Sequence, residues 1–458
     1  MIASTKAVVH VTETKSILHV ISSRAHWAHR PPTRRAGTEF PWSSRVFTAP
    51  PRCRRPPSSI VFARRTMNRN IRTLRQAGMS AVVLAALGLS ACSSADGGSA
   101  AGITLEPAAE SQTLAGVCPE NVVVQLQWQP QSDMGGLFRM LGAGYAVDAD
   151  EKSVTGPLVA GGKDTGVDLT LRAGGPAIGF QSVTSQMYVD DSIALGVVHG
   201  DQVIAAAASQ PVVAVTPLLK YSPAILMWDA QTHPDWRTVA DIGQSDAFVV
   251  VSKEQLFPQW LVARGLLKES QIDTSYDGAP SRFVGDPAIA QQGFANSEPY
   301  TYEYETPAWD KPVAYDLLKD SGFDIYASNI SVRADKLESL TPCLQKLVPI
   351  IQQSTADYIT APGVTNAAIV DVVSRDSSFS PYSEGEAEFS AQLLKDEGLI
   401  ANEADGSVGT YDMARVQGTV DELKPILVAG GAAIPDSLTA EQIYTNRFTD
   451  AAIGISSP

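Results

Sequence analysis

Histidine and cysteine are scarce in this chain, and their scarcity limits the chemistry it can carry. After residue 91 the only histidines are His199 and His233, and the only cysteines are Cys92, Cys118 and Cys343. No H-E-x-x-H, G-x-S-x-G or Walker-type motif is present. A triad built on His199 is the enzymatic alternative. We therefore expect no cofactor, no metal site and no catalytic residue.

Basic residues are also few beyond residue 91. Residues 92–458 contain 20 lysines and arginines against 47 aspartates and glutamates. A surface with this excess of negative charge repels nucleic acid and acidic lipid headgroups. The charge balance therefore excludes a nucleic-acid partner, and it leaves a lipid anchor as the means of membrane attachment.

The sequence has no apolar run long enough to cross a membrane. Residues 77–89 (AGMSAVVLAALGL) are apolar apart from Ser80, but they would span only roughly 20 Å as a helix, against about 30 Å of hydrocarbon. Arg69, Arg72 and Arg75 precede them. A charged start followed by a short apolar stretch predicts a secretory signal over residues 67–91. A buried apolar helix is the alternative.

The signal ends in Leu89-Ser90-Ala91-Cys92, which resembles the lipobox of bacterial lipoproteins. The resemblance implies that Cys92 is acylated and becomes the first residue of an exported protein, lipid-anchored to the outer face of the cell membrane. Residues 92–117 would form a flexible tether. Residues 1–66 are rich in arginine and proline, and we expect translation to begin at Met67; a basic nucleic-acid-binding arm is the alternative.

Strand-like and helix-like segments alternate along the rest of the chain, from residues 122–128 (VVVQLQW) to residues 323–327, and the chain becomes largely helical after Lys336. This order predicts an α/β fold with mainly parallel sheets. The glycine-rich residues 149–166 interrupt it and suggest a surface excursion or flap. Residues 300–304 (YTYEY) alternate as a strand does.

Several short motifs together resemble the substrate-binding proteins of ABC importers, in the thiamine-pyrimidine, nitrate and sulfonate branch. The motifs are Gln127-Trp128-Gln129-Pro130, Asp133, Gly136-Leu137-Phe138, Gly144-Tyr145, Val167-Asp168-Leu169, residues 190–203 and residues 294–300. Their order and spacing match over roughly residues 122–429. The chain departs from the branch between Tyr145 and Val167, where it has about twenty residues in place of a short turn.

The resemblance implies a bilobed periplasmic-binding-protein fold of type II, with two α/β lobes joined by a two-crossing hinge. Lobe 1 would take residues 118–214 and 327–440, lobe 2 would take residues 215–326, and residues 441–458 would be a tail. A small-molecule ligand would lie in the cleft and closure would be a hinge motion. The implied partners are the ABC permease and ATPase subunits, and the protein would act as a monomer.

Candidate cleft residues are those that follow the expected strands. They are Trp128, Asp133, Gln186, Tyr188, Tyr221, Ser222, Trp228, Asn296, Glu298 and Tyr300. Aromatic faces with a carboxylate suit a planar heterocycle that carries N–H donors, such as a thiamine pyrimidine precursor or a flavin-like compound. Nitrate or a sulfonate would call for a basic residue, and among those between Tyr221 and Tyr300 we expect only Arg282 to reach the cleft.

Two further points stay open in the sequence. A disulfide between Cys118 and Cys343 is favoured over a metal site in an oxidising compartment, with two free thiols as the alternative. A surface lipoprotein that acts as an adhesin or scaffold is the alternative to a solute-binding protein. Ligand-dependent melting would separate these two functions.

Overall fold

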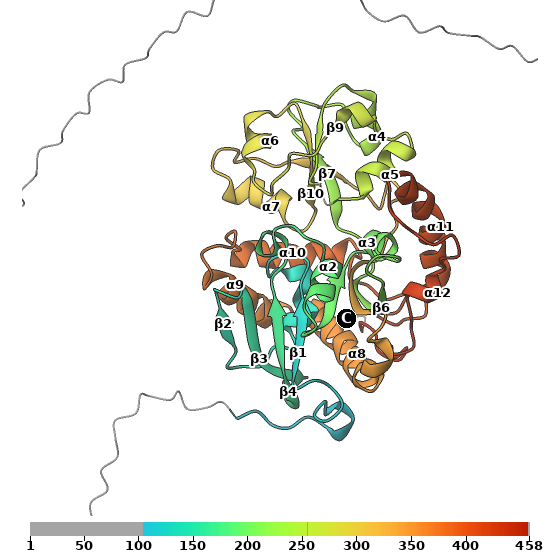
Figure 1. Cartoon of the computed structure of the whole chain (residues 1–458). Coiled ribbons are helices and arrows are strands. Elements are labelled where there is room, and N and C mark those ends of the chain that lie inside the picture. The colour runs from blue at the N-terminus through green and yellow to red at the C-terminus, as the bar shows by residue number, and fades with distance from the viewer. Residues whose placement is uncertain (1–103, 254, 457–458) are drawn as a thin grey trace, which may run out of the picture. The chain divides into compact units, whose positions relative to one another are not determined.

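The computed structural model describes residues 104–253 and 255–456, which belong to one compact unit of the chain (Figure 1). The predicted basic extension, secretory signal and acylated Cys92 lie outside the described residues. Within that part of the chain, no helix is both long and apolar enough to cross a membrane.

Seven strands form the first sheet, in the order β2-β3-β4-β1-β5-β12-β6. Their bounds are β1 Asn121–Gln125, β2 Ala146–Asp148, β3 Ser153–Ala160, β4 Lys163–Arg172, β5 Ile193–Val198, β6 Val212–Leu219 and β12 Ala327–Arg333. The central strand β1 pairs in parallel with β4 and β5, and the other strand pairs of this sheet are antiparallel. Four of the five residues of β1 are buried, as expected of a strand that is covered on both faces.

Five strands form the second sheet, in the order β11-β7-β10-β8-β9. Their bounds are β7 Ala224–Trp228, β8 Val249–Val250, β9 Ile272–Asp273, β10 Ala290–Phe294 and β11 Ala314–Leu317. β8 pairs in parallel with β9 and β10, whereas β7 is antiparallel to both β10 and β11.

The chain passes between the two sheets twice, through residues 220–223 after β6 and residues 318–326 before β12. The predicted bilobed α/β fold is therefore confirmed, and lobe 1 and lobe 2 below mean the parts built on the first and the second sheet. The boundary expected at residues 214–215 falls inside β6, which stays in the first sheet to Leu219. Both sheets are mixed rather than mainly parallel. In the first sheet β12 returns antiparallel to β5 and β6, and in the second sheet β7 is antiparallel to β10 and β11.

Helices cover both faces of the first sheet (Figure 1). Val122 and Val124 pack in one core with α1 Gly135–Phe138, α8 Leu337–Thr360 and α9 Gly363–Ser374. Val123 points to the opposite face, as strand alternation requires, and packs in the core that holds α2 Val183–Val189, α3 Gly200–Ala205, α11 Met413–Ala429 and α12 Ala440–Ile443. α10 Glu384–Asp396 contacts α9 and α8.

The helices described in lobe 2 are all short. They are α4 Val239–Gln244, α5 Phe257–Ala263, α6 Ser281–Gly285, α7 Glu298–Tyr300 and a π-helical turn, Thr301–Glu305, that continues α7. Residues 300–304 are therefore helical and not a strand, since the alternation of tyrosines does not outweigh the packing of Tyr302 into the core of lobe 2. α11 contacts α3 in lobe 1 and α5 in lobe 2.

Two segments that we expected to be loose are packed. The glycine-rich residues 149–166 belong to the antiparallel hairpin of β3 and β4, and Gly161 and Gly162 occupy its turn with φ of 57° and 81°. Glycine adopts this left-handed backbone without a steric penalty. Residues 104–117 of the expected tether lie along the same hairpin, where Leu114 is buried and its N–H donates to the carbonyl of Thr165 at 2.8 Å.

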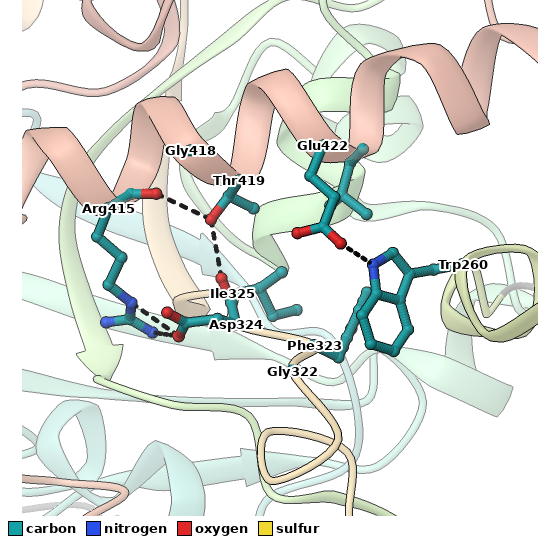
Figure 2. Close-up of a pocket in the computed structure, with 10 residues that line it drawn as sticks. Trp260, Gly322, Phe323, Asp324, Ile325, Arg415, Gly418, Thr419 and Glu422 are labelled. Carbon is teal, nitrogen blue, oxygen red and sulfur yellow. Dashed lines mark hydrogen bonds and ion pairs between the residues drawn. The ribbon is translucent and has the colours of Figure 1, made fainter. Parts of the chain in front are cut away.

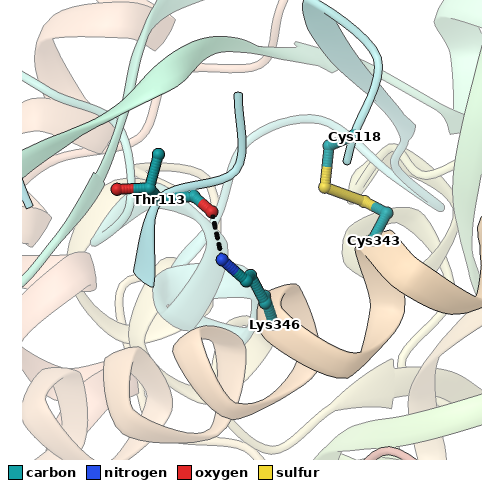
Figure 3. Close-up of a disulfide and its surroundings, with 4 residues drawn as sticks. All are labelled: Thr113, Cys118, Cys343 and Lys346. Atoms are coloured by element: carbon teal, nitrogen blue, oxygen red, sulfur yellow. Dashed lines mark hydrogen bonds between the residues drawn. A yellow bond between two sulfur atoms is a disulfide. The ribbon is translucent and has the colours of Figure 1, made fainter. Parts of the chain in front are cut away.

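Cys118 and Cys343 form a disulfide between the segment before β1 and the second turn of α8 (Figure 3). Lys346, one turn further along α8, donates from Nζ to the carbonyls of Glu110 and Thr113, both at 3.0 Å. The start of the described chain is thus fixed to α8 by one covalent bond and two hydrogen bonds.

Candidate functional site

The lobes meet where segments of lobe 2 face the first strand of lobe 1 and α10. A cavity of about 260 Å³ lies there, lined by Phe180 of lobe 1 and by Lys253 and residues 274–277 of lobe 2. The rings of Phe180 and Trp128 lie 6.0 Å apart between centroids. A Cβ built on Gly278 would lie 3.8 Å from Cζ2 of Trp128, so this part of lobe 2 lies against the indole. Aromatic surface from lobe 1 therefore borders the cavity.

Three of the buried oxygen atoms without a hydrogen-bond partner among the described residues belong to candidate residues or their neighbours, outside the lining of the cavity. They are Oε1 of Gln127, Oδ1 of Asp133 and Oδ1 of Asn296. Nε2 of Gln127 donates to Oδ2 of Asp133 at 3.2 Å and to Oγ of Ser328, at the start of β12, at 2.8 Å. Nδ2 of Asn296 donates across the lobes to Oγ of Ser390 at 3.0 Å. All three unpaired atoms are acceptors, so the set is complementary to a group that donates.

Asp133 is held in an environment that disfavours its charge. Burial raises its pKa to about 6, against the opposing effect of hydrogen bonds from the backbone and from Gln127. Because burial disfavours its charged form, a hydrogen-bond donor or a cation stabilises this carboxylate more than it would stabilise an exposed one. Its place after β1, in the 3-10 turn Ser132–Met134, follows the general preference for ligands at the carboxyl ends of parallel strands.

Glu298 forms its side-chain hydrogen bonds within lobe 2. Its Oε2 accepts from the N–H of Phe294 at 2.7 Å, and its Oε1 accepts from the hydroxyl of Tyr276 at 3.3 Å. Burial raises the pKa of Glu298, and burial together with the nearby carboxyl raises the pKa of Tyr276. Because both carboxylate oxygens are engaged in lobe 2, Glu298 orients the Tyr276 ring that lines the cavity.

Other predicted residues lie away from the cavity. Trp228 is 2% exposed in the core of lobe 2, with its ring 6.2 Å from that of Trp236. The hydroxyl of Tyr188 donates to the carbonyl of Pro211 at 2.9 Å and its ring lies under Arg333. Pro211 precedes β6 and Arg333 ends β12, so Tyr188 is at the end of the sheet opposite to the crossings.

Gln186, Tyr221 and Ser222 also have structural contacts of their own. Gln186 donates to Oε1 of Gln181 at 2.8 Å beside α2. Tyr221 lies in the first crossing with the guanidinium of Arg415 at 4.3 Å from its ring centroid, and Ser222 accepts from the N–H of Ala224 in the same crossing. Tyr300 packs on Phe389 of α10 at 5.6 Å between ring centroids, at the contact between the lobes.

Sequence reasoning missed Phe180, Lys253 and Tyr276. We expected Arg282 to be the basic residue at the cleft, but its Nη2 lies 3.4 Å from Oδ2 of Asp273, whereas Lys253 lines the cavity. Lys253 comes shortly after β8, so its place after a strand was a usable signal. Phe180 lies in a loop with a φ of 57°, and it belongs to no strand-like or helix-like pattern in the sequence.

A larger cavity, of about 450 Å³, lies between α11 and lobe 2 (Figure 2). Several of its polar groups bind one another: Nε1 of Trp260 donates to Oε1 of Glu422 at 2.8 Å, and Nη2 of Arg415 lies 2.6 Å from Oδ1 of Asp324, whereas the buried Nη1 of Arg415 has no partner among the described residues. Thr419 donates to the carbonyl of Asp324 at 2.8 Å. These bonds tie α11 to residues of lobe 2 and of the second crossing, so the cavity belongs to the hinge and not to the cluster of unpaired acceptors.

The two histidines do not share a site. His199 precedes α3 in lobe 1, and burial lowers its pKa to about 4. His233 stacks on Trp236 in lobe 2 at 3.6 Å between ring centroids. Over residues 104–253 and 255–456, no group of three or more His, Cys, Asp or Glu side chains is placed to hold a metal ion.

Comparison with known proteins finds similar solved structures only. No family model matches the chain, and no curated protein matches it. The alkanesulfonate-binding protein SsuA from Xanthomonas axonopodis pv. citri, bound to MOPS, is 13% identical over 71% of this chain and 98% of its own, with a TM-score of 0.46. A ligand-binding component of an ABC-type import system from Staphylococcus aureus, with zinc bound, is 10% identical over 73% and 100%, with a TM-score of 0.45.

The periplasmic nitrate-binding protein NrtA from Synechocystis PCC 6803 is 11% identical over 71% of this chain and 92% of its own, with a TM-score of 0.42. Likenesses of this size carry no argument about what this chain binds. The case for its function therefore rests on the residues and contacts described above.

Proposed function

We propose that the protein is the extracytoplasmic solute-binding component of an ABC importer, and that it captures a small heteroaromatic solute between its lobes for delivery to the permease. The observation that carries the proposal is the presence of three buried, unpaired acceptors, on Gln127, which precedes Trp128 in the chain, on Asp133, which binds Gln127, and on Asn296. The resemblance of residues 122–429 to such proteins and the two-crossing, bilobed fold support it.

The chemistry of these groups selects the ligand class. A buried acceptor without a donor costs about 1–3 kcal/mol, so a ligand that brings N–H groups to several of them regains that free energy on binding. Trp128, Phe180 and Tyr276 offer ring faces for a planar heterocycle. A thiamine pyrimidine precursor or a flavin-like compound supplies both features. In this proposal the ring stacks on the aromatic surface and its amino or ring N–H groups bind the acceptors.

One observation favours a second ligand class. Lys253 lines the cavity beside Phe180 and Tyr276, and its ammonium would suit nitrate or the sulfonate group of a short alkylsulfonate. Against it stand the carboxylate of Asp277 in the same lining and the three unpaired acceptors, which repel an anion. We therefore keep nitrate or sulfonate binding as the second candidate.

The location and partners form part of the same proposal. The predicted signal and lipobox over residues 67–92 support an exported protein that Cys92 anchors to the outer face of the membrane, where it would meet the permease and ATPase subunits of an importer. Binding and release need no chemical step, and His199 and His233 lie in separate lobes, so we propose that the protein is not an enzyme.

Ligand binding can be tested without knowing the solute. Native mass spectrometry of protein purified from its host would reveal a retained solute, and calorimetric titration would follow with thiamine pyrimidines, flavins, nitrate and short sulfonates. We expect one ring compound to bind and to raise the melting midpoint in proportion to ln(1 + [L]/Kd). Tight binding of nitrate or a sulfonate would select the second candidate. Absence of any ligand would favour an adhesin or scaffold, and turnover of a compound would indicate an enzyme.

A further inference from the structure

One face of α10 docks on lobe 2. Oγ of Ser297 donates to Oε1 of Glu386 at 2.6 Å, and Oγ1 of Thr301 donates to the same oxygen at 3.3 Å. One helical turn away, Asn296 binds Ser390. These contacts join the start of α7 in lobe 2 to a helix that belongs to lobe 1, so they exist only while the lobes are together.

The packing around these hydrogen bonds is close. Tyr300 of lobe 2 lies against Phe389, and its hydroxyl fills the space beside Gly385, where any Cβ would clash with it. Glu386 is 3% exposed and Ser390 is fully buried. We call the contact of residues 296–301 with Gly385, Glu386, Phe389 and Ser390 the α10 clasp.

Glu386 is the one carboxyl at the centre of the clasp, and the charged groups that face it are acidic. Glu298 and Glu305 of lobe 2 act on it through their charges. The phenol of Tyr382 lies on the lobe 1 side of Glu386. Among the described residues, Glu386 forms no ion pair with a lysine or an arginine. Ionisation of Glu386 in the closed protein therefore places a third negative charge in a buried contact without a cation.

We propose that the α10 clasp is a pH-sensitive latch, which holds the two lobes together while Glu386 is protonated and releases them when Glu386 ionises. The two hydroxyls of Ser297 and Thr301 position the carboxyl, and opening of the lobes exposes it to water, where its charge is solvated. The latch needs no ligand, so it stands apart from the solute-binding proposal.

The direction of the pH dependence follows from the pKa of Glu386. Burial, and to a smaller extent the charges of Glu305 and Glu298, raise it to about 8 in the closed protein from an ordinary value of 4.5. The closed state thus binds one more proton than the open state between these two values. Raising the pH through this range lowers the ratio of closed to open molecules by up to about tenfold per pH unit, and the effect ends above pH 8.

The distance between the lobes tests the latch directly. Spin labels attached through unnatural amino acids at Phe248 in lobe 2 and Val364 in lobe 1, both exposed, would report that distance in the full chain without a ligand. We expect the wild type to shift toward longer distances between pH 7 and pH 9. This window lies above the pKa of about 6 of Asp133, whose ionisation is then nearly complete.

Three variants separate the latch from a general effect of pH. Glu386→Gln cannot ionise and should stay closed up to pH 9. Glu388→Gln changes an exposed carboxyl on the same helix and should behave as the wild type. Glu305→Gln removes one facing charge that opposes closure when Glu386 ionises, so it should keep a larger closed fraction than the wild type at pH 9. A wild-type distance that does not change with pH, or a shift that survives in Glu386→Gln, would overturn the proposal. If Glu386→Gln fails to fold, a closed fraction in Glu305→Gln at pH 9 no larger than that of the wild type would do so.

Discussion

Cys118 and Cys343 are bonded to each other although 225 residues separate them in the chain. The loop that it closes contains the strands of both sheets, β1 to β12, and all of lobe 2, and the bond anchors the segment before β1 on α8. Its removal therefore frees the start of the folded chain and enlarges the unfolded ensemble at the same time.

We expect the double variant Cys118→Ser/Cys343→Ser to fold but to lose stability. The chain-entropy model gives a nominal loss of roughly 5 kcal/mol for a loop of this length, and measured losses are often smaller. Urea unfolding of the variant beside the wild type measures the difference, with reduced wild type as a second reference. Alkylation of both thiols in the unreduced native protein would contradict the bond itself.

Processing should yield a protein that begins at Cys92. In the lipoproteins that residues 89–92 resemble, the thiol is acylated before the peptide bond ahead of it is cut, so Cys92→Ala should stall processing or release the protein from the membrane. Intact mass of the membrane-extracted wild type measures the start and the added acyl mass. A mature chain that begins upstream of Met67 would contradict the assignment.

Two tryptophans should respond differently to the same substitution. Trp128→Ala removes stacking surface beside the cavity. It should weaken the binding of every ring ligand by about 1–3 kcal/mol and have a small effect on the stability of the fold. Trp228→Ala opens a hole in the core of lobe 2 and should cost about 3–5 kcal/mol of folding free energy, while the folded molecules bind as before. Calorimetric titration and urea unfolding of both variants separate the two effects. Equal losses of binding would show that Trp128 acts only through stability.

Asp133→Asn should stabilise the free protein and weaken its binding of a donating ligand. The pKa of about 6 in the folded protein lies above the ordinary value of 3.8, so Asp133 destabilises the fold progressively as the pH rises from 3.8 to 6. Removing its charge should therefore raise the unfolding free energy by about 3 kcal/mol at pH 7 and by little at pH 4. Urea unfolding at both pH values measures this. An equal gain at pH 4 would mean that charge is not the cause.

The order of strand-like and helix-like segments predicted the α/β class because each strand carries its own apolar pattern, and strand alternation is a local property. The bilobed arrangement with two crossings came instead from the family resemblance of residues 122–429. The placement of single aromatic residues is not local. Trp128 follows β1 and Trp228 ends β7, but all five residues of β7 are buried, so its pattern gives no sign of which side faces the other lobe. Tyr188 lies in the last turn of α2, and only the position of β6 and β12 shows that this end points away from the crossings.

Lys253 and the α10 clasp depend on contacts between segments far apart in the chain. Nothing near Glu386 in the sequence indicates that Ser297 and Thr301 will enclose it. They precede it by 89 and 85 positions, and the chain between includes both the return to lobe 1 and the whole of α8. Likewise, the glycines of residues 149–166 suggest a surface excursion or flap, although Gly161 and Gly162 form only the turn of a long hairpin. A turn signal fixes where the chain reverses and not how far the strands on either side extend.

The two edge strands of the first sheet are protected from pairing with another chain in different ways. β2, at one edge, is three residues long, ends at Asp148 and is followed by Asp150 and Glu151. The charges of these three residues and their tight turn leave little backbone for another chain to pair with. At the other edge β6 is covered by the C-terminal chain, where the N–H of Thr445 donates to the carbonyl of Ala214. Exposed strand edges are the usual starting points of intermolecular β-pairing. Truncation ahead of Tyr444 would uncover a fully buried eight-residue strand, and such a protein should aggregate through that edge before it loses its fold.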